Sequence, residues 1–130
     1  MTLALEPYAS QLARWPATGK HILAQFDAES IVVYQAYPEE IGRFAAAQGR
    51  LGGPAFSFER MSWIKPNFLW MMYRSGWGTK PAQEVILAIR IARIGFDHIL
   101  ELAVPSSFGA GAYATHDDWQ VVVMVSVVRL

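Results

Sequence analysis

The stretch EVILAIRIAR, residues 84–93, decides the fold. Ile86, Ala88 and Arg90 alternate there with branched aliphatic residues, and a period of two is typical of a β-strand. A second run, SIVVYQAY over residues 30–37, is rich in β-branched and aromatic residues and also predicts a strand. The two runs therefore predict a mixed or antiparallel sheet.

The flanking sequence adds helices to this sheet. Helices are expected over residues 6–14, 38–49, 66–76 and 95–103, where apolar residues recur at helical spacing or Pro precedes them and Gly follows. Further strands are expected over residues 21–26, forming a hairpin with 30–37, over 56–64, and over 121–128 after a short helical turn. No repeat or linker divides the chain, so we expect one α+β domain over residues 1–130, with three to four helices.

Composition excludes several classes of function. Hydrophobic residues make up 53% and charged residues 17%, which favours a dense core over disorder. Eleven basic and eleven acidic residues cancel, so nucleic-acid binding is not expected as the main role. The absence of cysteine excludes disulfides and thiolate chemistry. With neither a signal peptide nor an apolar run of membrane-spanning length, we expect a soluble cytoplasmic protein with no membrane association.

Residues 60–83 form the candidate ligand site. This segment contains four basic residues and no acidic one, and three of the five tryptophans fall in it at intervals of seven. In a helix that starts at Pro66, Asn67, Trp70 and Arg74 share one face, where a guanidinium, an amide and an indole can hold a planar or anionic ligand. The alternative is a buried helix with cations at its ends. A buried cation needs a partner, which this segment does not provide.

Other polar residues are weaker candidates. On a strand over residues 30–37, Tyr34 faces one side and Gln35 and Tyr37 the other, so Gln35 either bonds to backbone or faces a pocket. His21, His98 and His116 form no close pair, and no metal site is expected. The His116-Asp117 pair is compatible with an acid/base pair or with a solvated loop.

The chain resembles a family of uncharacterised proteins, domain of unknown function 4291. The resemblance is carried by VYQAY at residues 33–37 and by RMSWIKPNFLWMMYRSGW at residues 60–77. It continues through Lys80, Gln83, the strand over 85–91, Gly95-Phe96 and HDDW at residues 116–119, and covers roughly residues 31–119. Family members typically continue past the position of Arg129-Leu130 into a further segment, so that segment is expected to be missing here. The resemblance implies a family and no activity.

A looser resemblance is to ADP-ribosyltransferases, at the level of the fold. In their general plan a first strand carries Tyr-His or Arg, a later strand ends in Ser, and a further strand brings a Glu. Tyr34-Gln35, Ser62 and Glu84 take these positions here, with Gln in place of His. The resemblance implies NAD as the ligand, with catalytic roles for Gln35, Ser62 and Glu84 in a divergent transferase.

The leading hypothesis is a ligand-binding domain for an anionic nucleotide such as NAD. The residues expected to bind it are Tyr34, Tyr37, Arg60, Trp63, Lys65, Asn67, Trp70 and Arg74. One alternative is a non-catalytic interaction module that forms a homodimer, because an apolar strand over residues 121–128 would leave an edge for pairing. A third is RNA binding through basic and aromatic side chains.

Overall fold

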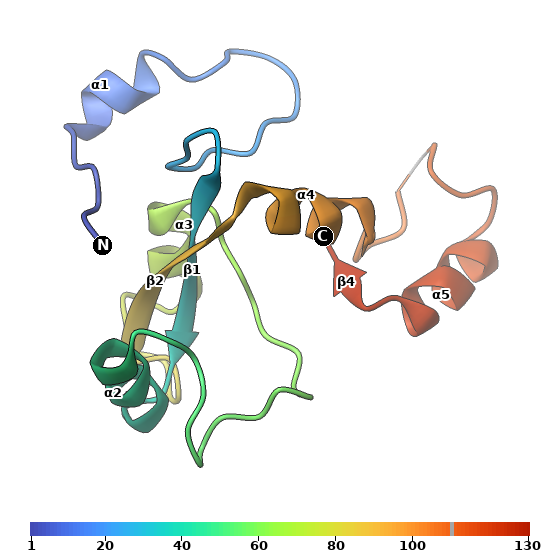
Figure 1. The fold of residues 1–130 in the computed structure, drawn as a ribbon. Helices are drawn as coiled ribbons and strands as arrows, with labels where there is room; N and C mark the ends of the chain where they lie inside the picture. Colours follow the sequence, from blue (N-terminus) through green and yellow to red (C-terminus); the bar gives the residue numbers. More distant parts are fainter. Residues whose placement is uncertain (110) are drawn as a thin grey trace. The chain divides into compact units, whose positions relative to one another are not determined.

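The computed structural model describes residues 1–109 and 111–130 of the chain. Helices and strands alternate in no regular β-α repeat, which confirms the α+β class (Figure 1). The chain divides into two compact units, residues 1–91 and 92–130. The elements are α1 (Tyr8–Leu12), β1 (Ser30–Tyr37), α2 (Glu39–Gln48), α3 (Phe68–Arg74), β2 (Val85–Ala92), α4 (Arg93–Glu101), β3 (Ala103–Val104), α5 (His116–Val125) and β4 (Val128–Arg129).

The first unit is built around β1. This strand pairs with β2, which runs in the opposite direction (Figure 1). On the other edge of β1, Tyr34 and Lys65 exchange two backbone hydrogen bonds of 2.8 and 2.9 Å, and the Val32 amide donates to the Gln25 carbonyl. Because both edges of β1 are at least partly paired, it is the most buried element of the chain.

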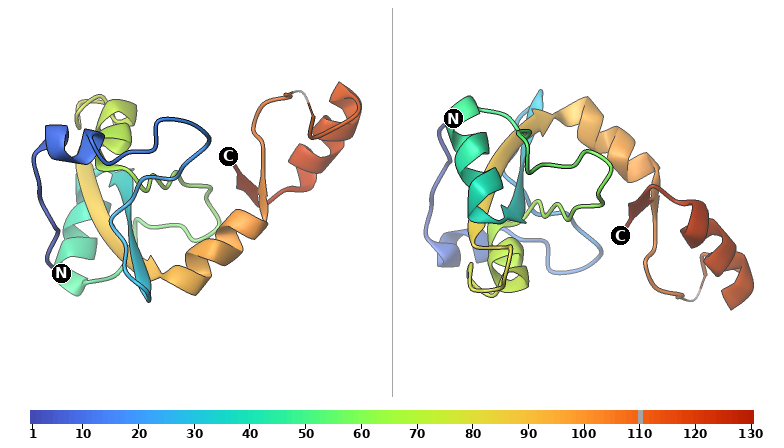
Figure 2. Two further views of the ribbon diagram at one scale, coloured as in Figure 1. Left: turned by 90° about the horizontal axis from the view of Figure 1, so that it is seen from above. Right: turned by 90° about the horizontal axis from the view of Figure 1, so that it is seen from below.

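Helices α2 and α3 cover opposite faces of the two strands (Figure 2). Met71 of α3 is only 1% exposed and packs with Val32 and Tyr34. On the α2 side, Gly42 lies against Val85 of β2 so closely that a Cβ on residue 42 would be 2.4 Å from a Val85 methyl carbon. The alternation of β1 side chains thus supplies both faces of the core.

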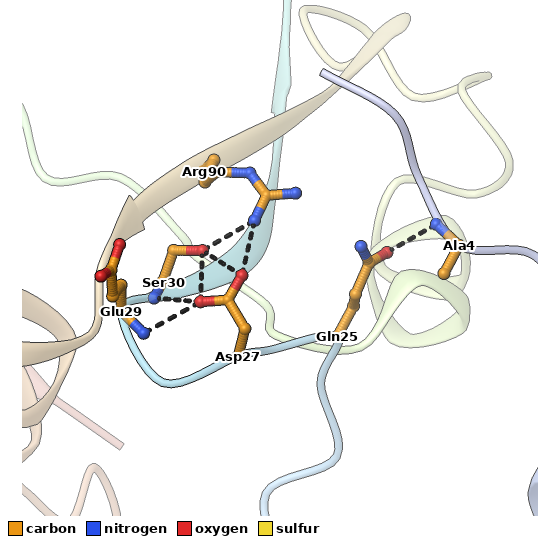
Figure 3. Close-up of polar contacts among 6 residues, drawn as sticks. All are labelled: Ala4, Gln25, Asp27, Glu29, Ser30 and Arg90. Carbon is orange, nitrogen blue, oxygen red and sulfur yellow. Dashed lines mark hydrogen bonds and ion pairs between the residues drawn. The ribbon is translucent and has the colours of Figure 1, made fainter.

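A polar cluster fixes the start of β1 against the end of β2 (Figure 3). The Asp27 carboxylate accepts hydrogen bonds from the amides of Glu29 and Ser30, at 2.9 and 2.7 Å. Arg90 of β2 donates to the Ser30 hydroxyl at 2.7 Å and to Asp27 at 3.3 Å. These bonds hold the pKa of Asp27 below its usual value, chiefly through the backbone amides of Glu29 and Ser30.

The second unit contains α4, α5 and a parallel pair, β3 with β4, in which Ala103 faces Val128. The Trp119 indole of α5 donates to the Pro105 carbonyl at 2.9 Å. Thr115 caps α5 by accepting from the Asp118 amide at 3.1 Å. Across the described residues of both units, no helix has the length and apolar character that crossing a membrane requires.

Several predicted elements are confirmed. The strands over 30–37 and 84–93 and the helix over 38–49 correspond to β1, β2 and α2 within two residues. The helices predicted over 66–76 and 95–103 correspond to α3 and α4, and the one over 6–14 is reduced to the five residues of α1.

Three predicted strands are wrong. Of residues 21–26 only Phe26 forms a bridge, with Ile31, and residues 56–64 form no strand, since only the adjacent Lys65 pairs with β1. Residues 121–125 are helical, because the Thr115 cap starts a helix that overrides the strand preference of the valines. The apolar strand edge that favoured a homodimer is therefore absent from this region, and the homodimer stays a prediction.

Candidate functional site

Three polar side chains meet beside the end of β1. The Gln35 amide donates to the Ser62 hydroxyl at 3.1 Å, and the Tyr37 hydroxyl donates to the Gln35 carbonyl oxygen at 3.2 Å. The hydroxyls of Tyr37 and Ser62 are 3.3 Å apart. Gln35 is only 7% exposed, so this cluster satisfies a buried amide and fixes the chain at Ser62 against the strand.

A pocket of about 270 Å³ opens at this end of the sheet. Its walls come from the end of β1, the start of α2, α3 and the loops over 55–63 and 81–83. None of the described residues that line it is acidic, and two are arginines. The lining residues are Ala36, Tyr37, Pro38, Ile41, Ala55, Phe56, Ser57, Arg60, Met61, Ser62, Trp63, Met71, Arg74, Pro81, Ala82 and Gln83.

The cations of this region contact aromatic rings in place of carboxylates. The Arg74 guanidinium carbon is 4.9 Å from the centroid of the Trp63 ring. Lys65 Nζ is 5.5 Å from the Trp63 centroid and 5.8 Å from the Trp70 centroid. Within the described chain, neither Arg60 nor Arg74 forms an ion pair, so both guanidiniums remain available to an anion.

The structure brings some of the predicted site residues together. Tyr37, Arg60, Ser62, Trp63 and Arg74 line the pocket, and Gln35 contacts two of them. Lys65 and Trp70 do not line the pocket; Lys65 contacts the rings of both Trp63, which lines it, and Trp70.

Three other predicted site residues have local partners elsewhere. Tyr34 lies in the core cluster with Met71, and burial raises the pKa of its hydroxyl. Asn67 caps α3 by accepting from the Trp70 amide at 3.2 Å. The Glu84 carboxylate accepts from the Ala82 amide at 2.8 Å. None of the three lines the pocket.

The burial expected of the helix over residues 66–76 is wrong for most of its residues. Met71 is the buried residue of α3, whereas Trp70 is 68% and Tyr73 83% exposed. A two-stranded sheet covers one side of a helix, so the remaining aromatic residues face solvent. The cations of this segment are exposed or half-buried, so burial alone does not require a counter-charge for them.

The loop over residues 76–84 forms a pocket wall through residues 81–83, none of which is among the residues expected to bind the ligand. Trp77 and Ala82 have φ values of +58° and +62°, in the left-handed region that L-residues rarely adopt. Pro81, Ala82 and Gln83 from this loop line the pocket. Strained backbone of this kind clusters at binding sites, and the Glu84 carboxylate stabilises it here by holding the Ala82 amide.

No metal site emerges from the described part of the chain, where no three histidine or acidic side chains gather closely enough to hold an ion. His116 contacts Phe108 and Trp119 rings, at centroid distances of 5.5 and 5.1 Å, and its Nδ1 is 4.0 Å from Asp117. His116 and Asp117 are both exposed, and the pair belongs to the second unit.

The profile of a family described as Domain of unknown function (DUF4291) matches residues 21–130, a longer stretch than the residues 31–119 expected from the motifs. No curated protein and no solved structure matches the chain.

Proposed function

The chain belongs to the DUF4291 family, and we propose that its pocket binds an anionic, planar ligand, a nucleotide such as NAD. One observation carries the proposal: Arg60 and Arg74 line a pocket to which no described acidic residue contributes. Arg74 is half-buried and Arg60 is exposed, and neither has a carboxylate partner among the described residues. Guanidiniums pair with phosphate through two parallel hydrogen bonds, so the two arginines favour an anionic ligand.

The other walls of the pocket suit the remaining parts of a nucleotide. Trp63 offers an indole to a base, and its ring is already held by Arg74. The hydroxyls of Tyr37 and Ser62 offer donors and acceptors to a ribose. The volume of about 270 Å³ is near the lower end of ligand pockets, at roughly 300 Å³. It would enclose one nucleotide part of NAD and leave the other outside.

A transferase reaction remains a prediction that depends on this binding. Gln35 and Arg60 would orient the nucleotide, Ser62 would hold the ribose, and Glu84 would stabilise positive charge on the sugar. The contact of Gln35 with Ser62 supports the first part of this arrangement. The Glu84 carboxylate is engaged with the Ala82 amide, so its nearest role is to hold the pocket wall.

Isothermal titration calorimetry with NAD, and with ATP for comparison, tests the proposal. Saturable binding is expected, and Arg60→Ala and Arg74→Ala are each expected to weaken it by about tenfold or more, the usual effect of a lost hydrogen bond to a charged group. Arg14→Ala is the matched control, because Arg14 pairs with Glu6 at the surface and does not line the pocket.

Calorimetry is preferable to indole fluorescence here, because Arg74→Ala changes the surroundings of the Trp63 reporter even without ligand. Absence of heat with both nucleotides would overturn the proposal. So would equal affinity in Arg60→Ala, Arg74→Ala and the parent protein.

A further inference from the structure

A strip of aromatic side chains continues outward from the pocket. It consists of Trp63, Trp70 and Tyr73, which are 59%, 68% and 83% exposed. Trp63 is shared with the pocket, whereas Trp70 and Tyr73 do not line it. Trp70 and Tyr73 are three residues apart in α3, which places them on neighbouring positions of the helix surface. Large exposed rings gathered in this way mark a binding surface.

Cations are interleaved with the rings of this strip. Lys65 is within 5.8 Å of the ring centroids of both Trp63 and Trp70, and Arg74 contacts Trp63 from α3. The Lys65 backbone is fixed by its two hydrogen bonds to Tyr34 of β1. The backbone that carries Lys65 is therefore fixed before any ligand arrives, which lowers the entropy cost of binding.

Charge in the chain is strongly segregated toward this surface. Residues 60–83 contain Arg60, Lys65, Arg74 and Lys80 and no acid, which gives four positive charges. The rest of the chain holds seven basic and eleven acidic residues, a net charge of −4. The overall neutrality that argued against nucleic-acid binding therefore conceals a local excess of positive charge.

We propose that the strip binds a single-stranded segment of nucleic acid. Its unpaired bases stack on Trp70 and Tyr73, and its phosphates pair with Lys65 and Arg74. Base-on-ring stacking needs unpaired bases and no particular sequence, so the surface prefers single strands to duplexes. This activity goes beyond the nucleotide pocket, because Lys65, Trp70 and Tyr73 lie outside it.

Charge also argues against a second copy of this chain as the occupant. Two strips that face each other bring Lys65 and Arg74 of one copy toward the same cations of the other. The described residues of the strip and of its surroundings over 60–83 include no carboxylate to offset that repulsion. A polyanion with flat, apolar bases complements both properties of the surface.

Fluorescence anisotropy with labelled oligothymidine and oligouridine tests the proposal, with a duplex of equal length as the comparison. Tight binding is expected for one or both single strands and weaker binding for the duplex. Affinity is expected to fall with salt, with a log–log slope no steeper than about −3, since four cations are present and each phosphate contact on a single strand contributes about −0.7.

Three variants address the strip and two serve as controls. Trp70→Ala and Lys65→Gln are each expected to weaken oligonucleotide binding, Trp70→Ala by about tenfold, while Trp70→Phe keeps most of it. Tyr8→Ala and Lys20→Gln remove an exposed ring and a cation outside residues 60–83 and are expected to change nothing. Circular dichroism verifies that each variant is folded.

The proposal for the pocket and the proposal for the strip can be tested separately. Trp70→Ala is expected to leave NAD binding intact, and Arg60→Ala is expected to weaken NAD binding while keeping most of the oligonucleotide affinity. No binding of either single strand, or equal binding of single strand and duplex, would overturn the proposal. Sedimentation that shows a dimer converted to monomer by Trp70→Ala would assign the strip to self-association instead.

Discussion

Helices α3 and α5 are both short, apolar and capped by a side chain, yet they are fixed to very different degrees. Asn67 caps α3 and Thr115 caps α5 in the same way, by accepting from a backbone amide three residues on. In α3, Met71 is inserted between the helix and the sheet, whereas no residue of α5 is buried. A cap therefore determines where a helix begins, and a buried residue attaches the helix to the rest of the fold.

The exposed residues of the two helices also differ in chemistry. The exposed apolar side chains of α3 are mainly aromatic, with Lys65 and Arg74 beside them, while those of α5 are the aliphatic Val121, Met124 and Val125. The charges of α5 itself are the first-turn acids Asp117 and Asp118. The apolar composition of a helix does not show whether it belongs to the core or to a binding surface. The charged residues beside its apolar side chains do distinguish the two cases.

The largest expected difference between the helices is at their methionines. Met71→Ala removes a side chain that is 1% exposed and is expected to cost about 2–5 kcal/mol of the free energy of unfolding. Met124→Ala removes one that is 75% exposed and is expected to change stability by less than about 0.5 kcal/mol. Urea denaturation followed by circular dichroism measures both.

Equal costs at the two methionines would contradict this comparison. A large cost at Met124 that grows with protein concentration would show that α5 is covered in solution by another copy. That result would support the homodimer prediction, with the surface of α5 as the interface in place of the predicted strand edge.

The caps are expected to give a smaller effect, of about 1 kcal/mol each. Because α3 is packed on the sheet, Asn67→Ala is expected to lower the unfolding free energy of the first unit. Thr115→Ala is expected to speed amide hydrogen exchange within α5, with little change elsewhere, since α5 buries no residue. Asn67→Asp and Thr115→Ser keep the acceptor and serve as controls, and a shared global effect of both alanine variants would argue against the distinction.

The smallest effect is expected at Asp27 and depends on pH. The fold lowers the pKa of this carboxyl below the ordinary aspartate value of about 3.9, so the deprotonated form contributes stability above that pH. This contribution is lost as pH falls through the lowered pKa. Asp27→Asn is therefore expected to destabilise the β1 corner at neutral pH, with a difference that narrows below about pH 4.

Thermal unfolding of Asp27→Asn and the parent protein at several pH values measures this effect. Glu29→Gln is the control, since the Glu29 side chain makes no hydrogen bond in the cluster and only its amide does. A difference that is constant from neutral pH to pH 3 would show that Asp27 acts through shape and not through its charge.

The sequence predicts the parts of the fold that depend on local pattern. Alternation identifies β1 and β2, and Pro38 with Gly49 delimits α2, whose C-cap Gly49 adopts a φ of +65°. The local pattern fails over residues 56–64, whose alternation suits a strand, because residues 60–63 are instead held at Ser62 by the side chains of Gln35 and Tyr37. A contact across 27 residues of sequence is not encoded in any short window.

The sequence predicts the residue types of the candidate site better than it predicts their positions in space. The absence of acids over residues 60–83 identifies Arg60, Trp63 and Arg74, which the structure places in one pocket. Gln35 and Ser62, which the resemblance to ADP-ribosyltransferases gives separate catalytic roles, are in contact, and the roles themselves stay predictions. Asn67 and Glu84 are expected to serve the ligand site, but Asn67 caps α3 and Glu84 accepts from the Ala82 amide. The sequence does not show whether a polar side chain bonds to nearby backbone or to a ligand.

The contact of Gly42 with Val85 has a mechanical consequence for the pocket. Because Gly42 has no side chain, the Val85 side chain packs directly against the backbone of α2 at this position. Sliding α2 along β2 by one turn would bring Ala45 or Ala46, each with a Cβ, to the place of Gly42, so the contact favours one register of the helix on the strand. Pro38 and Ile41, from the start of the same helix, form one wall of the pocket. The contact between Gly42 and Val85 lies outside the pocket, yet it fixes the position of this pocket wall.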